Sequence, residues 1–371
     1  MAIFIENLQE TYEVAWLVIC AAFILGGAFG IVAEISRYCM RAAVAEWFSA
    51  EGEERGKLKK GRDRTFQILS AIVVATVGTS LLALFGAIDF SGTIYLSSPL
   101  RPIATLLGGL IFGAGMVLAG GCVSRLLVLG ASGNMRSVVP LLVTGIAGYA
   151  TLRGILALPR LSVEQLFETQ VGTANWLQGF GIAPEYLALL VAFVAIVGIA
   201  RISHRFGYLS AGAVVSGGLV GLLVVGGWAV TGILGDDGFD PVPLTSLSFV
   251  APVAESIQYL MIFTGDTLRF SIALVGGVIA GAFLSSLVFG RFSLKGFQSE
   301  TSILRYVAGG IAMGVGGVLA LGCTVGQGLS GVSTGSVNSI LAVLAIVAGA
   351  AATFAWQNRV ARIEKALVAA Q

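Results

Sequence analysis

Four cysteines are the residues of this chain whose type and spacing could do chemistry. Cys122 and Cys323 each follow a glycine inside a long apolar run, and Cys39 lies in the stretch SRYCMR. A thiol is a weak hydrogen-bond donor and a soft, polarizable group, so it suits a substrate that presents sulfur rather than oxygen. The cysteines form no CxxC pair and the chain has a single histidine, which argues against a metal site. We expect free thiols, no metal and no cofactor, and only a packing role for Cys20.

Glycines flank both Gly-Cys pairs and interrupt the helical pattern there. The backbone N–H groups of Gly121, Gly322 and Gly326 could form a nest for an anion at the start of a following helix. A lone cysteine in a membrane segment is usually a small apolar residue, but two cysteines at matching positions after glycine favour a substrate-binding site. Arg125 follows Cys122 by three residues and leaves two interpretations open: it pairs with an anion, or its side chain extends to the cytoplasmic interface.

The composition places these residues in a membrane. Of the 371 residues, 56% are hydrophobic and only 11% are charged, and the mean hydropathy is +0.92. Such values are typical of an all-α polytopic membrane protein. The net charge is +2 and no basic stripe with interleaved aromatic residues occurs, so nucleic acid is not an expected partner. No Walker motif is present, which argues against ATP hydrolysis by this chain.

Nine apolar stretches are long enough to cross a bilayer or nearly so, and the fifth is short. Basic residues cluster at 37–64, 201–205 and 291–295 and near the C-terminus, and the positive-inside rule places these clusters in the cytoplasm. The acidic N-terminal segment does not resemble a signal peptide. We therefore expect the N-terminus outside and the C-terminus in the cytoplasm. The expected spans are 15–36, 66–88, 102–121, 137–156, 185–200, 208–234, 269–290, 302–321 and 338–357.

The chain consists of two related halves. The aligned pairs of segments are 108–132 with 309–333, without a gap, and 25–39 with 216–230, where Cys39 meets Val230. The flanking charges run in opposite directions in the two halves, so the repeats are inverted in the membrane, as in transporters whose substrate site lies near the midplane. We expect a single transmembrane domain over 1–371, with a first repeat at 15–156, a connecting segment with one span at 157–207, and an inverted second repeat at 208–357.

At these residues the sequence resembles the YeeE/YedE family of bacterial sulfur transporters. The elements that carry the resemblance are SRYC, GGLIFGAGMVLAGGC and GGIAMGVGGVLALGCTVGQGL, in that order, and the resemblance covers roughly residues 25–357. It implies a compact helical fold with short membrane-buried helices in the bacterial inner membrane. It also implies that thiosulfate, or a related small sulfur anion, is passed toward the cytoplasm between relay cysteines at Cys39, Cys122 and Cys323. A small TusA-like sulfur carrier is the implied cytoplasmic partner.

Two other functions compete with transport of a sulfur anion. In a membrane-embedded sulfurtransferase, a cysteine would take up sulfane sulfur as a persulfide and donate it to a carrier, which requires a thiolate in an electropositive setting. Cys39, flanked by Arg37 and Arg41, could meet that requirement. A passive channel for neutral hydrogen sulfide would need no anion nest. The sequence VSR after the first Gly-Cys pair departs from the family pattern and leaves the sulfur species open.

Local spacing predicts three further structural features. The loop at 157–184 could form an amphipathic helix on the outer surface, with its aromatic residues at the membrane interface. Charged residues one helical turn apart could pair. The expected pairs are Glu34 with Arg37 and Asp266 with Arg269.

Overall fold

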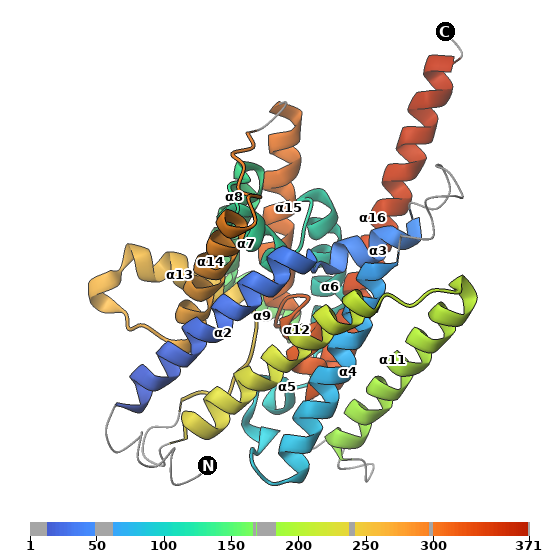
Figure 1. The fold of residues 1–371 in the computed structure, drawn as a ribbon. Helices are drawn as coiled ribbons and strands as arrows, with labels where there is room; N and C mark the ends of the chain where they lie inside the picture. The colour runs from blue at the N-terminus through green and yellow to red at the C-terminus, as the bar shows by residue number, and fades with distance from the viewer. Residues whose placement is uncertain are drawn as a thin grey trace.

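The fold is a bundle of membrane-spanning helices (Figure 1), seen in a computed structural model that describes residues 13–48, 62–165, 168, 183–236, 242–296 and 300–369. Over these residues, eight helical segments are long and apolar enough to cross a membrane. They confirm the expected all-α polytopic membrane protein. The segments are built around α2 (Val14–Ser36), α4 (Asp63–Leu84), α6 (Pro102–Leu118), α8 (Met135–Leu152), α11 (Pro184–Phe206), α12 (Ala211–Ala229), α14 (Phe270–Val288) and α16 (Val337–Ala369).

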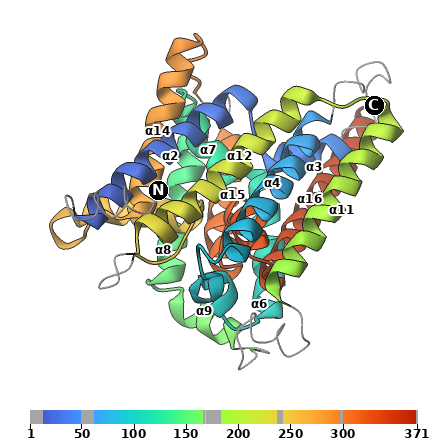
Figure 2. The same ribbon diagram turned by 60° about the horizontal axis from the view of Figure 1, so that its bottom comes forward.

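Two helices differ in length from the spans that the sequence predicted. The expected span at 302–321 is α15 (Glu300–Leu319), whose apolar part, Ile303–Leu319, is shorter than the eight long segments. The expected short span at 185–200 is longer than predicted, since α11 has 23 residues. The helix continues through its basic end until Gly207, whose left-handed conformation (φ 61°) ends it. In Figure 2, α11 lies at the outside of the bundle, and it packs against α4.

The helices of the two halves exchange partners in a matched way. Helix α2 packs along α14 and α12 along α4, while α6 packs along α16 and α15 along α8. The helices α2, α4, α6 and α8 of the first half can be matched in order with α12, α14, α15 and α16 of the second half. The α2–α14 contact is then equivalent to the α12–α4 contact, and the α6–α16 contact to the α15–α8 contact. Helices α6 and α15 also pack against each other. This arrangement is the one expected of two repeats related by a two-fold axis. It supports the division into repeats, whose boundaries and inversion stay a prediction.

Two short helices extend the same correspondence. Helix α3 (Met40–Phe48) packs on α4 and α16, and α13 (Val250–Met261) packs on the equivalent helices α14 and α8. Helix α13 lies in a segment for which the sequence predicted no span. We therefore treat α3 and α13 as equivalent elements of the two halves.

This equivalence corrects the expected counterpart of Cys39. Cys39 immediately precedes α3, and Phe249 immediately precedes α13, so Phe249 occupies the place of Cys39 in the second half. Val230 instead begins a π-helical turn, η4 (Val230–Leu234). A gap-free alignment missed the difference because the second half inserts η4 and a non-helical segment between α12 and α13.

Glycines let the central helices approach closely. Gly109 and Gly113 face the backbone of α16, and the equivalent Gly310 and Gly314 face the backbone of α8. A Cβ atom added at Gly314 would lie 2.6 Å from the carbonyl oxygen of Thr144, too close for any larger residue. The two GxxxG pairs of the sequence are therefore helix-packing contacts.

One of the two expected ion pairs forms. Asp266 contacts Arg269 at 3.3 Å, as predicted. The pairing expected for Glu34 is wrong, because its carboxylate lies 3.3 Å from the guanidinium of Arg291, beyond the end of α14. Arg37 has a left-handed backbone at the end of α2, so the regular helical spacing on which the expectation depended stops there.

The loop after α8 begins with α9 (Ala157–Glu164). Arg101, at the start of α6, contacts Glu164 at 2.6 Å and Glu168 at 2.7 Å. The loop is therefore fastened to the residue that precedes a central helix. The aromatic residues that the sequence assigned to the membrane interface lie outside the described residues.

Candidate functional site

The three cysteines of the predicted site share one local structure. Each stands two residues after a residue with a left-handed backbone that follows the end of a long helix. A short helical segment follows each cysteine: α3 begins at Met40, α7 (Val123–Ala131) at Val123 and the π-helical η6 (Gly326–Gly331) at Gly326. The left-handed residues are Arg37 (φ 53°) before Cys39, Gly120 (φ 82°) before Cys122, and Leu321 (φ 56°) before Cys323. The prediction that Gly-Cys marks an interruption of the helix is confirmed, and the same turn occurs at Cys39 without a glycine.

Each cysteine precedes the new helical segment, and its backbone carbonyl accepts the first helical hydrogen bond. The cysteine carbonyl accepts a hydrogen bond from the N–H four residues later, from Ala43 (3.2 Å), Leu126 (2.9 Å) and Gln327 (2.8 Å) in turn. A thiol in this position faces the free N–H groups and the positive end of the helix dipole. The three thiols therefore lie where the backbone N–H groups and the helix dipole favour a negative charge.

The N–H three residues after each cysteine is directed to its thiol. The Gly326 N–H donates to the Cys323 sulfur at 3.3 Å. The N–H groups of Ala42 and Arg125 lie beside the sulfurs of Cys39 and Cys122 in the same way. Of the three glycines predicted to form a nest, Gly326 directs its N–H to a sulfur atom, and the anion nest itself stays a prediction.

The three thiols converge inside the bundle. The side chains of Cys39 and Cys122 lie within hydrogen-bonding range of each other, and Cys323 lies near Cys122. The exposed fractions of the three residues are 6%, 0% and 1%. Ser124 lies 3.4 Å from the Cys122 sulfur, and Thr324 contacts the same thiol. Two elements of the first half and one of the second therefore form a single buried cluster.

The fourth thiol is separate. Cys20 is exposed on α2, where it lines an apolar groove formed with α13 and α14. It contributes nothing to the cluster, in agreement with its exclusion from the predicted site.

Two tyrosines that the sequence did not single out complete the cluster. Tyr38 lies near all three thiols and is buried. Tyr95 lies near Cys323 and is also buried. It comes from α5 (Ile94–Ser97), a four-residue helix too short to produce a recognisable pattern in the sequence. The adjacency of Tyr38 to Cys39 was the one signal that could have been used.

The three glycines of the predicted site have packed surroundings. A Cβ atom at Gly326 would lie 2.7 Å from the Ser248 hydroxyl, and one at Gly322 would lie 3.2 Å from the Gln327 side chain. At Gly121 it would lie 3.3 Å from a Leu126 methyl group. All three positions therefore keep the backbone close to side chains that fix the turns around the thiols.

Phe249 closes the other side of Cys323. Its backbone lies against the Cys323 thiol, and its ring packs on that of Phe29 with centroids 5.0 Å apart. Phe249 is fully buried. The second half thus places an aromatic ring where the first half has Cys39, which makes the cluster of three thiols asymmetric.

Arginines gather around the Cys39 and Cys122 end of the cluster. Arg125 donates to the carbonyl oxygen of Ala33 at 3.1 Å and lies near Cys39, Cys122, Arg37 and Arg64. Among the described residues, no carboxylate forms an ion pair with Arg125. The charge of Arg125 is therefore directed to the thiols as well as to one backbone carbonyl.

Arg41 adds a second charge to this end. It lies near Cys39 and Cys122 and also near Arg305 of α15. Its Nε atom is buried and has no hydrogen-bond partner among the described residues. The guanidinium thus retains an unused donor beside the thiols.

Helices from the two halves pack in equivalent pairs around a buried polar centre. This arrangement defines the molecule as a multi-pass membrane transporter. The chain belongs to the Sulphur transport family, which it matches over residues 35–352. This match confirms the resemblance expected from the sequence.

Two relatives span nearly the whole chain. The thiosulfate transporter TsuA of Escherichia coli (strain K12) is 23% identical over 339 residues, which are 84% of this chain and 86% of that protein. The thiosulfate transporter TsuA of Spirochaeta thermophila is 26% identical over 348 residues, which are 85% of this chain and 91% of that protein. At these identities the relatives indicate a common family and leave individual residue roles to be argued from the site.

Proposed function

We propose that this protein transports thiosulfate across the bacterial inner membrane and that the anion passes along Cys39, Cys122 and Cys323. The observation that carries the proposal is the convergence of three buried thiols at three helix starts. The terminal sulfur of thiosulfate is soft and accepts weak hydrogen bonds from thiols. Because such bonds are weak, the anion can leave each site as readily as it enters.

The surrounding backbone supplies the attraction for charge. Each thiol lies at the positive end of a helical segment. At Cys323, for example, the Gly326 N–H donates a hydrogen bond to the sulfur. A doubly charged anion in a dry cluster needs such dipoles, since an unpaired buried charge is very costly. Helix ends supply them without a strongly bound counter-ion that would trap the substrate.

The arginines distinguish the two ends of the proposed path. Arg125 and Arg41 lie near Cys39 and Cys122, so the positive potential increases from Cys323 toward Cys39. With the C-terminus in the cytoplasm, this end faces the cytoplasm. The anion would enter past Phe249, pass Cys323, Cys122 and Cys39 in order, and be released near the arginines. A TusA-like sulfur carrier would then receive it on that face.

The test is uptake of radiolabelled thiosulfate into liposomes that contain the purified protein. We expect uptake that unlabelled thiosulfate suppresses and that sulfate leaves unchanged, because sulfate has no terminal sulfur for the thiols to contact. Empty liposomes give the baseline. Equal suppression by sulfate, or no uptake above the baseline, would contradict the proposal.

Separate labels on the two sulfur atoms distinguish transport from sulfurtransferase chemistry. In the latter, a cysteine thiolate attacks the sulfane sulfur, a persulfide forms and sulfite leaves with the electron pair of the broken S–S bond. Transport delivers both labels to the lumen in equal amounts. Delivery of the sulfane label alone, with sulfite left outside and one sulfur atom added to the protein mass, would identify the enzyme instead.

Arg125→Gln is expected to raise the KM for thiosulfate by roughly three- to tenfold, or about 0.7 to 1.4 kcal/mol, without abolishing uptake. Glutamine keeps a donor for the Ala33 carbonyl but removes the charge beside the thiols. Initial uptake rates over a range of thiosulfate concentrations give the KM. Arg359→Gln, at an exposed site on α16, removes the same charge elsewhere and should leave the KM unchanged. An unaltered KM in Arg125→Gln would assign this residue to packing alone.

A further inference from the structure

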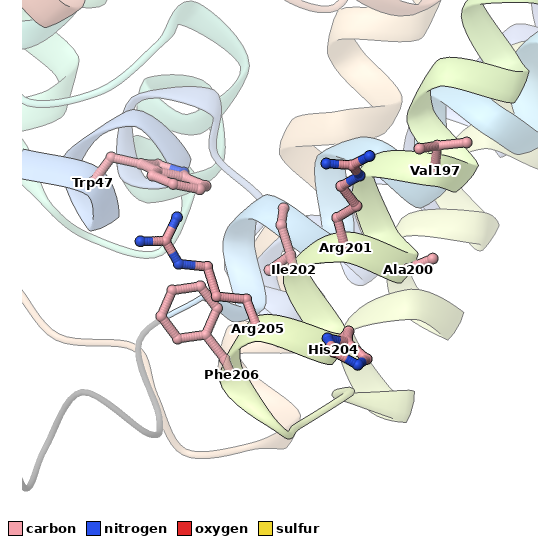
Figure 3. A pocket seen from close by; sticks show the side chains of 8 residues that line it. All are labelled: Trp47, Val197, Ala200, Arg201, Ile202, His204, Arg205 and Phe206. Carbon is pink, nitrogen blue, oxygen red and sulfur yellow. The ribbon is translucent and has the colours of Figure 1, made fainter.

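A second polar feature lies outside the cysteine cluster, at the basic end of α11. A cavity of about 750 Å³ opens there between α3 and α11. Trp47 lies on its α3 side, and Arg201, Arg205 and Phe206 lie on its α11 side. Figure 3 shows the Arg205 side chain reaching from α11 toward the Trp47 ring, with the Phe206 ring beside it. The cavity thus combines positive charge with aromatic surface.

A third arginine strengthens the charge of this cavity. The guanidinium of Arg62 lies between the rings of Trp47 and Phe206, 3.8 Å from each centroid. Its Nη1 atom is buried and has no hydrogen-bond partner among the described residues. Arg205 lies close enough to repel it. Two like charges held together with an unused donor favour binding of an anion.

The carboxylates near this cavity accept hydrogen bonds from other groups. Glu46 lies near Arg62, but its oxygens accept hydrogen bonds from the N–H groups of Arg64 at 3.0 Å and Thr65 at 3.1 Å. Asp63 accepts the hydroxyl of Tyr208. These contacts fix the start of α4. Among the described residues, neither carboxylate forms an ion pair with Arg62, Arg201 or Arg205, so the arginines keep donors for a ligand.

The remaining wall of the cavity is apolar and continues along the membrane-facing side of α11. Val197 and Ala200 line the cavity. One and two turns before them, Phe193 and Val194 are 62% and 61% exposed. In a membrane-spanning helix such side chains face lipid. A ligand that fills the whole cavity therefore has an anionic head and an apolar tail.

We infer that this cavity binds the headgroup of an anionic phospholipid, with an acyl chain along α11. Basic pockets between transmembrane helices bind such headgroups through arginine and lysine, and the Trp47 ring suits the headgroup level of a bilayer. An acidic protein segment would match the charge but not the apolar wall that continues into the membrane. The site is independent of the cysteine cluster, so its test does not depend on thiosulfate transport.

A second cavity serves as an internal comparison. It has about 660 Å³ and lies between α2, α13 and α14. Its lining residues include Cys20, Phe23 and Tyr259 but no basic residue. An acyl chain in that groove would bind regardless of its headgroup. Selectivity for an anionic headgroup therefore reports on the cavity between α3 and α11.

The test is native mass spectrometry of the detergent-solubilised full chain with phosphatidylglycerol or phosphatidylethanolamine of identical acyl chains. We expect the protein to retain phosphatidylglycerol preferentially. Arg201→Gln combined with Arg205→Gln should reduce that retention at least about tenfold, since each basic side chain near a membrane surface contributes substantially to anionic lipid binding. Replacing both arginines with lysine should preserve most of the retention.

The matched control is Arg359→Gln combined with Arg362→Gln, which removes the same charge from the end of α16. This control should retain phosphatidylglycerol like the unaltered protein. The glutamine and lysine variants carry substitutions only at exposed positions of α11, and thermal unfolding in detergent alone checks that both are folded. Equal retention of the two lipids, or an equal loss in the control, would overturn the inference. So would displacement of phosphatidylglycerol by inorganic phosphate or by an acidic peptide at the same concentration.

Discussion

Replacing Cys122 with serine is expected to lower the initial rate of thiosulfate uptake at least about tenfold, equivalent to roughly 1.4 kcal/mol or more in the transport barrier. Serine keeps a donor of similar size, but its hydroxyl is a hard group that bonds oxygen and water more strongly than sulfur. Cys122 is the thiol that lies near both of the others. A path through the cluster has no route around it.

The control for this experiment is Cys20→Ser, because Cys20 is exposed on α2 and remote from the cluster. Its uptake rate should equal that of the unaltered protein at matched reconstitution. Cys39→Ser and Cys323→Ser should each show a loss of the same order as Cys122→Ser. If Cys122→Ser transports thiosulfate at the normal rate while it remains folded, the thiols are packing residues and the proposed path is wrong.

The parts of this site that the sequence predicted are those encoded by repetition. The two Gly-Cys pairs fall at the same place in both halves, and in both the backbone turns through a left-handed residue, Gly120 or Leu321. Matching interruptions of two apolar segments are visible without a structure because each is short, local and duplicated. Eight of the nine expected spans are long enough to cross a membrane in the described part of the chain. They were predictable for a similar reason, since hydropathy over about 20 residues is a local property.

The parts that the sequence missed depend on contacts between distant residues. Phe249 follows a stretch of polar residues and prolines that reads as a surface loop, although it is buried and its backbone lies against Cys323. Glu34 has a basic residue one turn away, yet its partner is Arg291, which only the packing of α2 on α14 brings near. Such pairings depend on the packing of helices from one half against helices from the other. No local sequence pattern indicates which helices pack together.

The same helix exchange makes one substitution severe. Gly277→Ala in α14 is expected to destabilise the protein by about 1 to 3 kcal/mol or to prevent folding, because a Cβ atom there would overlap the Phe23 carbonyl oxygen of α2. It would also lie 2.9 Å from the backbone nitrogen of Gly27. Both neighbours are backbone atoms of a packed helix, so no side chain can rotate away, and the α2–α14 contact must separate.

The adjacent Gly276→Ala is the matched control, because it makes the same chemical change in the same helix. A Cβ atom at Gly276 would lie 3.8 Å from the Phe23 ring, an ordinary packing distance. Alanine is also the better helix former by about 1 kcal/mol, so Gly276→Ala should match or exceed the stability of the unaltered protein. Thermal unfolding in detergent, followed by size-exclusion chromatography, measures both variants. Equal stability of the two variants would show that α2 and α14 are not held at backbone contact, and the equivalence of the α2–α14 and α12–α4 pairs would lose its main support.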